Sequence, residues 1–202
     1  KPYDIEAFKE LNNTFGFDIK FFKFHLTPDN VVLASGYDAV VIFVNDTIDS
    51  SMISTLSVSG VRLIALRSSG FNNVDLKAAL GRITVVRVPA YSPHAVAEHT
   101  VALMLNLNRK IHRAYFRTRD LNFSLNGLLG FDMNGKTAGV IGTGRIGKAL
   151  VKILAGFGME VLLFDKYPDE KFAVETGAKY VSLKQIYTNS DIISLNCPLT
   201  KE

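Results

Sequence analysis

The chain has 202 residues, and its 23 basic and 19 acidic side chains leave a net charge of +4. That length has room for one large domain or two small ones, and 48% hydrophobic with 21% charged residues excludes a disordered, collagen-like or coiled-coil protein. The small positive excess is spread along the sequence and does not indicate a nucleic-acid partner. No apolar run approaches the roughly 20 residues of a membrane helix, and the single cysteine cannot form an internal disulfide. A cytoplasmic protein with no membrane partner is therefore expected.

The first 88 residues alternate short apolar runs with amphipathic stretches, which is the pattern of strands and helices around a parallel sheet. A first helix is expected to end at Gly16, with Tyr3, Phe8, Leu11 and Phe15 on one face. Strands are expected at residues 17–24, 39–44, 61–66 and 83–88. These runs are rich in Val and Ile and lack polar alternation, so helices should cover both faces of the sheet.

Two further helices are expected between these strands. One begins near Asp49 and should turn Met52, Ile53 and Leu56 inward, and the other begins near Asn73. The fold class indicated is α/β with an open, doubly wound parallel sheet.

A linker with two prolines follows at residues 89–93, where Ser92 before Pro93 has the form of an N-cap followed by proline at the first helical position. One long helix is expected from His94 to about Arg119, because no Gly or Pro interrupts that stretch. A helix of this length is typical of a bridge between domains or of a subunit contact. Its second half is basic, and a solvated face accounts for those charges as well as a dedicated anion site does.

A second α/β unit is expected after the glycine-containing loop at residues 126–135. Its strands are expected at residues 137–141, 160–164, 180–181 and 191–196. Its first two helices are expected at residues 145–157 and 169–176, and Gly177 should end the second. A third helix is expected to begin at a capping box formed by Ser182 and Gln185.

The segment Gly142-Thr143-Gly144-Arg145-Ile146-Gly147 matches the G-x-G-x-x-G pattern between an expected strand and an expected helix. Gly142 would permit the tight turn, Gly144 would let a pyrophosphate approach the backbone, and Gly147 would let the helix pack closely on the strand. The helix N-terminus would add N–H groups and a favourable dipole for phosphates. This context favours a dinucleotide site over a glycine turn without a ligand.

Asp165 follows the next expected strand and lies 23 residues beyond Gly142 (165 minus 142). That separation is close to the roughly 20 residues expected for a carboxylate that binds the adenosine ribose. A carboxylate would repel a 2′-phosphate, so NAD is favoured over NADP, although the neighbouring Lys166 weakens this preference slightly.

Other candidate site residues carry weaker signals. Residues 67–75 join a strand end to a helix, where ligands bind in doubly wound sheets, but a plain loop with an asparagine N-cap is the simpler interpretation. The four histidines and the cysteine are more typical of packing or surface positions than of catalysts, and no metal-ligand spacing occurs. They are His25, His94, His99, His112 and Cys197.

Five stretches of the sequence resemble the family of D-isomer-specific 2-hydroxyacid dehydrogenases, and together the resemblance covers essentially the whole chain. They are residues 65–76 (ALRSSGFNNVDL), 88–99 (VPAYSPHAVAEH), 107–115 (LNRKIHRAY), the glycine motif and residues 193–200 (ISLNCPLT). Within the family, the stretch from Asn108 to Tyr115 is most similar to the D-lactate branch.

The resemblance implies two domains, a flavodoxin-like substrate domain over residues 1–92 and a Rossmann NAD-binding domain over residues 93–202, both incomplete in this chain. It also implies a homodimer formed through the helix that starts at Pro93. The substrate would be a small 2-keto or 2-hydroxy acid, with the backbone of Ser69 and Gly70 holding its carboxylate and Tyr91 reaching it from the linker.

The resemblance also assigns the cofactor contacts. The glycine loop with Arg145 and Ile146 would hold the NAD pyrophosphate, and Asp165 would bind the adenosine ribose. Cys197 and Pro198 would form one wall of the adenine site.

In the family, the catalytic arginine, glutamate and histidine follow the Cys-Pro-Leu-Thr segment, so no catalytic residue is expected among residues 1–202. The resemblance therefore implies part of an enzyme that reduces pyruvate to D-lactate with NADH, a part expected to be inactive alone. Two alternatives stay open. One is a related dehydrogenase for a larger keto acid, and the other is an NAD-binding module without catalysis.

Overall fold

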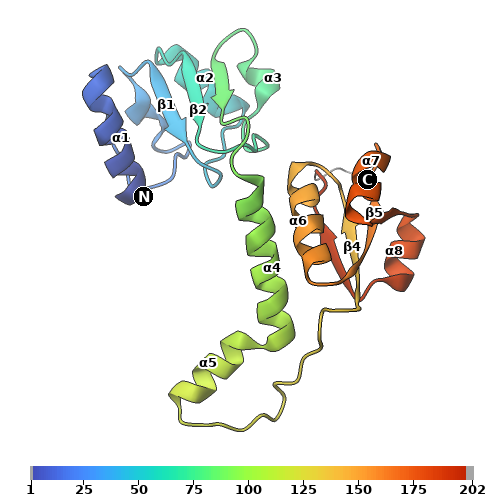
Figure 1. Cartoon of the computed structure of the whole chain (residues 1–202). Helices are drawn as coiled ribbons and strands as arrows, with labels where there is room; N and C mark the ends of the chain where they lie inside the picture. Colours follow the sequence, from blue (N-terminus) through green and yellow to red (C-terminus); the bar gives the residue numbers. More distant parts are fainter. Residues whose placement is uncertain (1, 199–202) are drawn as a thin grey trace. The chain divides into compact units, whose positions relative to one another are not determined.

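The structure is a computed structural model that describes residues 2–198 (Figure 1). The chain divides into two compact units, Lys1–Tyr91 and Ser92–Glu202. Each unit contains one parallel β-sheet with helices packed against it. Over the described residues, no helix combines the length and the apolar character needed to cross a membrane.

The first unit contains a three-stranded parallel sheet in the order β1-β2-β3. Its strands are β1 (Ala39–Ile42), β2 (Leu63–Leu66) and β3 (Thr84–Arg87). Its helices are α1 (Pro2–Phe15), the 3-10 helix η1 (Val31–Ala34), α2 (Ser50–Val58) and α3 (Leu76–Ala79). Three of the four strands expected from the sequence are confirmed, with shorter bounds, and η1 lies in a stretch for which no element was expected.

Local capping sets the start of α2 and α3. Asp49 caps α2 by accepting a hydrogen bond from the Met52 N–H at 2.9 Å. Asp75 caps α3 in the same way through the Ala78 N–H at 3.0 Å, so the helix expected near Asn73 begins at Leu76 and the expected asparagine N-cap is wrong. The Asn73 side chain instead donates to the carbonyl oxygen of Asp46 at 2.7 Å, which ties the loop before α3 to the loop after β1.

The sheet of the first unit is buried mainly on one face. Met52, Ile53 and Leu56 of α2 are buried, as expected, and pack in one cluster with residues of β1 and β2. Val41 and Val86, in the two outer strands, remain 50% and 44% exposed. The expectation that helices cover both faces is therefore wrong for this unit, because an apolar run does not reveal which neighbours are present to bury it.

Residues 17–24 do not form the expected strand. Helix α1 does form and ends before Gly16, whose φ of 69° is left-handed, but no residue of α1 is buried. Residues 17–24 are not hydrogen-bonded to β1, the neighbouring edge of the described sheet. An extended segment becomes a strand only by pairing with another, so its apolar composition alone was misleading.

The expected long helix is two helices, α4 (Pro93–Arg109) and α5 (Ile111–Arg119). Ser92 caps α4 and Pro93 occupies its first turn, as expected. The break is at Lys110, which adopts the left-handed conformation with φ 52°. Contacts with the following loop hold this break in place. Lys110 Nζ donates to the Leu129 carbonyl. The Asn108 side chain accepts from the Phe131 N–H at 2.9 Å and donates to the Phe131 carbonyl at 2.8 Å.

The second unit contains a four-stranded parallel sheet in the order β6-β5-β4-β7. Its strands are β4 (Thr137–Ile141), β5 (Glu160–Phe164), β6 (Lys179–Tyr180) and β7 (Ile192–Leu195). Its remaining helices are α6 (Arg145–Gly156), α7 (Glu170–Thr176) and α8 (Leu183–Asn189). Each of these elements was expected from the sequence, as were the left-handed Gly177 after α7 and the capping box of Ser182 with Gln185.

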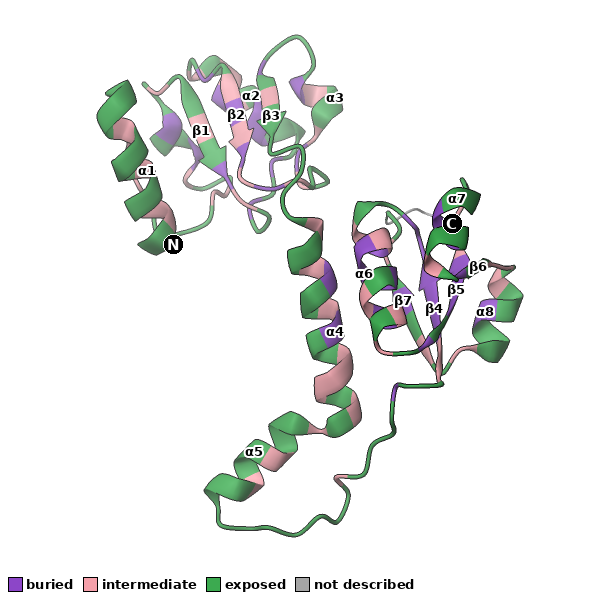
Figure 2. Cartoon of the chain, in the orientation of Figure 1, coloured by how far each residue is buried: buried purple, intermediate pink, exposed green. Residues whose placement is uncertain are grey.

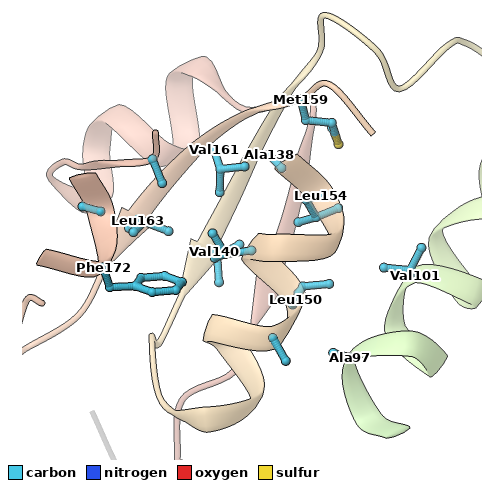
Figure 3. Close-up of a cluster of buried hydrophobic side chains, with 14 of the residues drawn as sticks. Ala97, Val101, Ala138, Val140, Leu150, Leu154, Met159, Val161, Leu163 and Phe172 are labelled. Atoms are coloured by element: carbon cyan, nitrogen blue, oxygen red, sulfur yellow. The ribbon is translucent and has the colours of Figure 1, made fainter. Parts of the chain in front are cut away.

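Helices cover both faces of this second sheet. On one face, Val101 of α4 and Leu150 of α6 belong to the cluster around Val140 of β4 (Figure 3). On the other face, Ile186 of α8 packs against Ile141. The doubly wound α/β fold expected from the sequence is confirmed in this unit.

Candidate functional site

The strand order of the second unit creates the crevice in which a ligand can bind. The chain runs outward from β4 through β5 to β6 and then returns to place β7 on the other side of β4. In open α/β sheets, ligands bind beyond the carboxyl ends of the strands at the point where the order reverses. Here the order reverses between β4 and β7, and the segments that follow their carboxyl ends are the glycine loop and residues 196–198.

Gly142 and Gly147 are required by the packing of this crevice. Gly142 has a φ of 94°, and a Cβ on it would lie 2.6 Å from the carbonyl oxygen of Asn196. A Cβ on Gly147 would overlap the carbonyl oxygen of Gly142. The two residues therefore let the loop turn sharply and let α6 lie directly against it, as the sequence predicts.

Gly144 differs from these two glycines. Its φ is −66°, which any residue adopts, and no heavy atom lies within 4 Å of the position a Cβ would take. Neither backbone conformation nor packing within the described chain requires glycine here. A Cβ would instead fill open space at the N-terminus of α6, where a phosphate would lie.

The start of α6 offers unpartnered backbone donors to an anion. The first N–H groups of a helix have no partner within it, and at α6 they belong to Arg145, Ile146 and Gly147. No side chain caps α6, whereas side-chain oxygens cap α2, α3, α4, α7 and α8. The geometry thus fits the pyrophosphate of a dinucleotide.

Asp165 lies at the end of β5, joined to the glycine loop. Its Oδ2 accepts hydrogen bonds from the Thr143 N–H at 2.6 Å and from the Thr143 hydroxyl at 3.0 Å. Its Oδ1 accepts from the Tyr167 N–H at 2.9 Å. Partial burial acts to raise the pKa of Asp165, but the donors from Thr143, Tyr167 and Lys166 outweigh it and hold the pKa below its usual value. The carboxylate is therefore ionised at neutral pH and able to accept from ribose hydroxyls.

Cys197 and Pro198 follow β7 and are both exposed. The backbone around Asn196 and Cys197 lies against Gly142, so these residues border the same crevice as the glycine loop. Leu199 and Thr200, which complete the motif cited above, lie outside the described residues. An adenine contact by Cys197 and Pro198 remains a prediction.

The candidate substrate residues belong to the first unit, at the carboxyl end of β2. The Ser68 hydroxyl donates to the Gly70 carbonyl at 2.9 Å and fixes the turn. Gly70 is exposed, and no heavy atom lies within 4 Å of the position its Cβ would take, so a small anion could approach its backbone. Tyr91 is 59% exposed. The Ser69 hydroxyl bonds the carbonyl of Pro89, two residues before Tyr91, at 3.4 Å.

Three residues that contact the candidate substrate loop or the candidate cofactor site were not predicted from the sequence. Arg87 of β3 donates to the Ser69 carbonyl at 2.7 Å and to its hydroxyl at 3.2 Å. Thr143, the variable residue inside the glycine motif, binds Asp165, and its hydroxyl lies 2.8 Å from that of Tyr180. A polar residue between the first two glycines is a local signal for Thr143, whereas only the tertiary structure reveals Arg87 and Tyr180.

Residues 101–202 match a protein family described as D-isomer specific 2-hydroxyacid dehydrogenase, NAD binding domain. A D-lactate dehydrogenase of Escherichia coli is 56% identical over 100% of this chain and 61% of its own length. A 2-hydroxyacid dehydrogenase homolog of Haemophilus influenzae is 52% identical, also over 100% of this chain and 61% of its length. The chain thus spans about three fifths of these relatives.

Solved structures give the same result. The apo-structure of D-lactate dehydrogenase from Escherichia coli aligns with a TM-score of 0.92 at 55% identity and covers 100% of this chain and 64% of that one. A D-lactate dehydrogenase from Aquifex aeolicus, complexed with NAD and lactic acid, aligns with a TM-score of 0.83 at 34% identity over 98% of this chain and 59% of that one. The match over residues 101–202 confirms NAD as the cofactor predicted from the glycine loop and Asp165. The chain belongs to the family of D-isomer-specific 2-hydroxyacid dehydrogenases.

Proposed function

We propose that the protein containing this chain is an NAD-dependent D-lactate dehydrogenase that reduces pyruvate to D-lactate in the cytoplasm of a fermenting cell. The observation that carries the cofactor part of the proposal is Gly144, whose missing side chain leaves an open approach to the N-terminus of α6. The names and the 56% and 52% identities of the relatives from Escherichia coli and Haemophilus influenzae support a hydroxyacid substrate.

The residues of the second unit bind and orient the dinucleotide in this proposal. The N–H groups that open α6 would hold the pyrophosphate, while Asp165 would accept from the adenosine ribose. Held by these residues, NADH would supply the hydride for reduction of the keto acid. Cys197 and Pro198 would exclude water from one side of the adenine.

The first unit would bind the carboxylate of the keto acid. The backbone of Ser69 and Gly70 lies at the carboxyl end of β2, and Arg87 adds a positive charge that contacts the Ser69 carbonyl. A small carboxylate fits backbone donors beside a fixed cation. Tyr91 would contact the same substrate from the end of this unit.

We also propose that the protein is a homodimer through α4, α5 and the loop that follows. A series of large apolar side chains is exposed along this segment, which is coloured mainly as exposed in Figure 2. The series comprises Leu103, Leu107, Ile111, Tyr115, Phe116, Leu121, Phe123, Leu125 and Leu129. Exposed apolar surface of this extent marks protein interfaces.

The test of the function is a turnover assay on the full-length protein. NADH oxidation is followed with pyruvate and with a branched-chain keto acid, and the configuration of the product is determined by chiral chromatography. Consumption of pyruvate with formation of D-lactate is expected. Formation of L-lactate would contradict the proposal, preference for the branched keto acid would favour the larger-substrate alternative, and NADH binding without turnover would favour a non-catalytic module.

A further inference from the structure

A chain of three side chains extends from the edge strand β6 to the proposed ribose carboxylate. The hydroxyl of Tyr180 lies 2.8 Å from the hydroxyl of Thr143, which lies 3.0 Å from Oδ2 of Asp165. Thr143 is only 5% exposed, and the ring of Tyr180 packs against the main apolar cluster of the second unit. The hydroxyl of Thr143 is thus shielded from water, and its two partners in the protein set its orientation.

The direction of the hydrogen bonds in this chain follows from the charge of Asp165. An ionised carboxylate can only accept, so the single hydroxyl proton of Thr143 must point at Asp165. The bond between the two hydroxyls must then be donated by Tyr180. Without Tyr180, the Thr143 hydroxyl would keep its bond to the carboxylate but lose the second partner that fixes its orientation.

This arrangement divides the two oxygens of Asp165 between different tasks. Oδ2 accepts from both the N–H and the hydroxyl of Thr143, which occupies its two acceptor positions. Oδ1 accepts one hydrogen bond of good geometry, from the Tyr167 N–H at 2.9 Å, and the nearby Lys166 N–H also lowers the pKa of this carboxyl. Oδ1 is therefore the less occupied oxygen, and it is the one that a ribose hydroxyl could reach beside the glycine loop.

We propose that Tyr180 is a positioning residue for NAD recognition, whose hydroxyl orients Thr143 so that Oδ1 of Asp165 is held ready for a ribose hydroxyl. The inference rests on the proposed function and goes beyond it by assigning part of the cofactor selectivity to a residue that does not itself touch the ribose. NADPH carries a phosphate in place of the 2′-hydroxyl and has no donor there for Oδ1 to accept. Loss of the positioning should therefore weaken NADH selectively.

The experiment measures the Kd of NADH and of NADPH, together with KM and kcat, for full-length wild type, Tyr180→Phe, Thr143→Val and Thr143→Ser. Tyr180→Phe should raise the Kd and KM of NADH about threefold, and Thr143→Val about tenfold, which are the effects of weakening and of removing one hydrogen bond to a charged group. The kcat and the Kd of NADPH should stay within about twofold of wild type. Thr143→Ser keeps the hydroxyl that Thr143→Val lacks, so its Kd for NADH should be close to that of the wild type.

Tyr187→Phe is the matched control, because this tyrosine is 61% exposed on α8 of the same unit. Equal losses for NADH and NADPH in Tyr180→Phe would show a general structural effect and overturn the inference, as would wild-type affinity for NADH. If Tyr180→Phe does not fold, the pair Thr143→Val and Thr143→Ser decides by the same criteria. A wild-type protein that does not bind NADH would instead reject the proposed function, and the inference with it.

Discussion

Gly142 at the end of β4 lies directly against Asn196 at the end of β7: a Cβ on Gly142 would come within 2.6 Å of the Asn196 carbonyl carbon and oxygen. Both atoms belong to backbone that the parallel ladder of β4 and β7 holds in place. Gly142→Ala should therefore destabilise the second unit by about 1–3 kcal/mol, because the left-handed φ of 94° adds strain to the overlap. Urea unfolding of the variant and the wild type measures the difference, and unchanged stability would contradict this packing.

Gly144→Ala is the matched substitution two residues away. No atom of the described chain would meet its Cβ, so the variant should unfold at the same urea concentration as the wild type. Its affinity for NADH should fall at least about tenfold, because the added methyl group occupies the approach to the N–H groups of α6. Titration of NADH by fluorescence checks this expectation. Wild-type affinity would mean that the pyrophosphate does not pass Gly144.

The second unit was predictable from its sequence because its signals are local. Apolar runs of strand length alternate with capped helices, and the glycine motif with Asp165 lies within 24 residues of one α/β unit. The failures concern properties set at a distance. Residues 17–24 have the composition of a strand but no partner to pair with, and Lys110 leaves the helical conformation because of contacts with Leu129 and the loop around it.

The same distinction applies to the site. Gly142, Gly144 and Gly147 could be assigned separate tasks from the motif alone. The structure shows a steric reason for Gly142 and Gly147, whereas the space beside Gly144 is open. Arg87 and Tyr180 could not be predicted from the sequence, because their partners lie far away along the chain. Arg87 is 18 residues from Ser69, and Tyr180 is 37 residues from Thr143. No local pattern encodes contacts that depend on how strands are placed side by side.

Asp165→Ala should weaken NADH binding more than NADPH binding. In the proposed site the ionised carboxylate would accept from the ribose of NAD and would repel the 2′-phosphate of NADP. Its removal should therefore weaken NADH binding and remove a repulsion from NADPH. A loss of about tenfold or more for NADH is expected, which corresponds to one hydrogen bond to a charged group. Isothermal titration with both cofactors gives the comparison, and equal losses would show that Asp165 does not discriminate between them.

Arg87→Met should raise the KM for pyruvate about threefold to tenfold, because the loop at Ser69 loses two donors that hold it in place. The KM for NADH should not change. Arg82→Met is the control, since Arg82 is also exposed and bonds only the Ser54 hydroxyl among the described contacts. Steady-state kinetics with both substrates distinguishes the two variants, and an effect on NADH alone would place Arg87 outside the substrate site.

Phe116→Glu should convert a dimer into a monomer. The residue is exposed on α5 and stacks edge to face with Tyr115, at a centroid distance of 5.5 Å, so a charge there would be buried in the proposed interface. Analytical ultracentrifugation of the full-length variant gives the oligomeric state. Thr188→Glu is the control for added charge, because Thr188 is exposed on α8, outside the proposed interface. A wild-type protein that sediments as a monomer would reject the dimer.

The contact between Gly142 and Asn196 also makes cofactor binding a measure of folding. One wall of the crevice follows β4 and the other follows β7, and the two walls meet where these strands pair in the folded sheet. Partly folded chains would therefore lack the binding site altogether. A ligand that binds only the complete unit stabilises it by about 2.7 kcal/mol at one hundred times its Kd. NADH should accordingly protect the whole segment between Thr137 and Leu195 from proteolysis, including cleavage sites that it never touches.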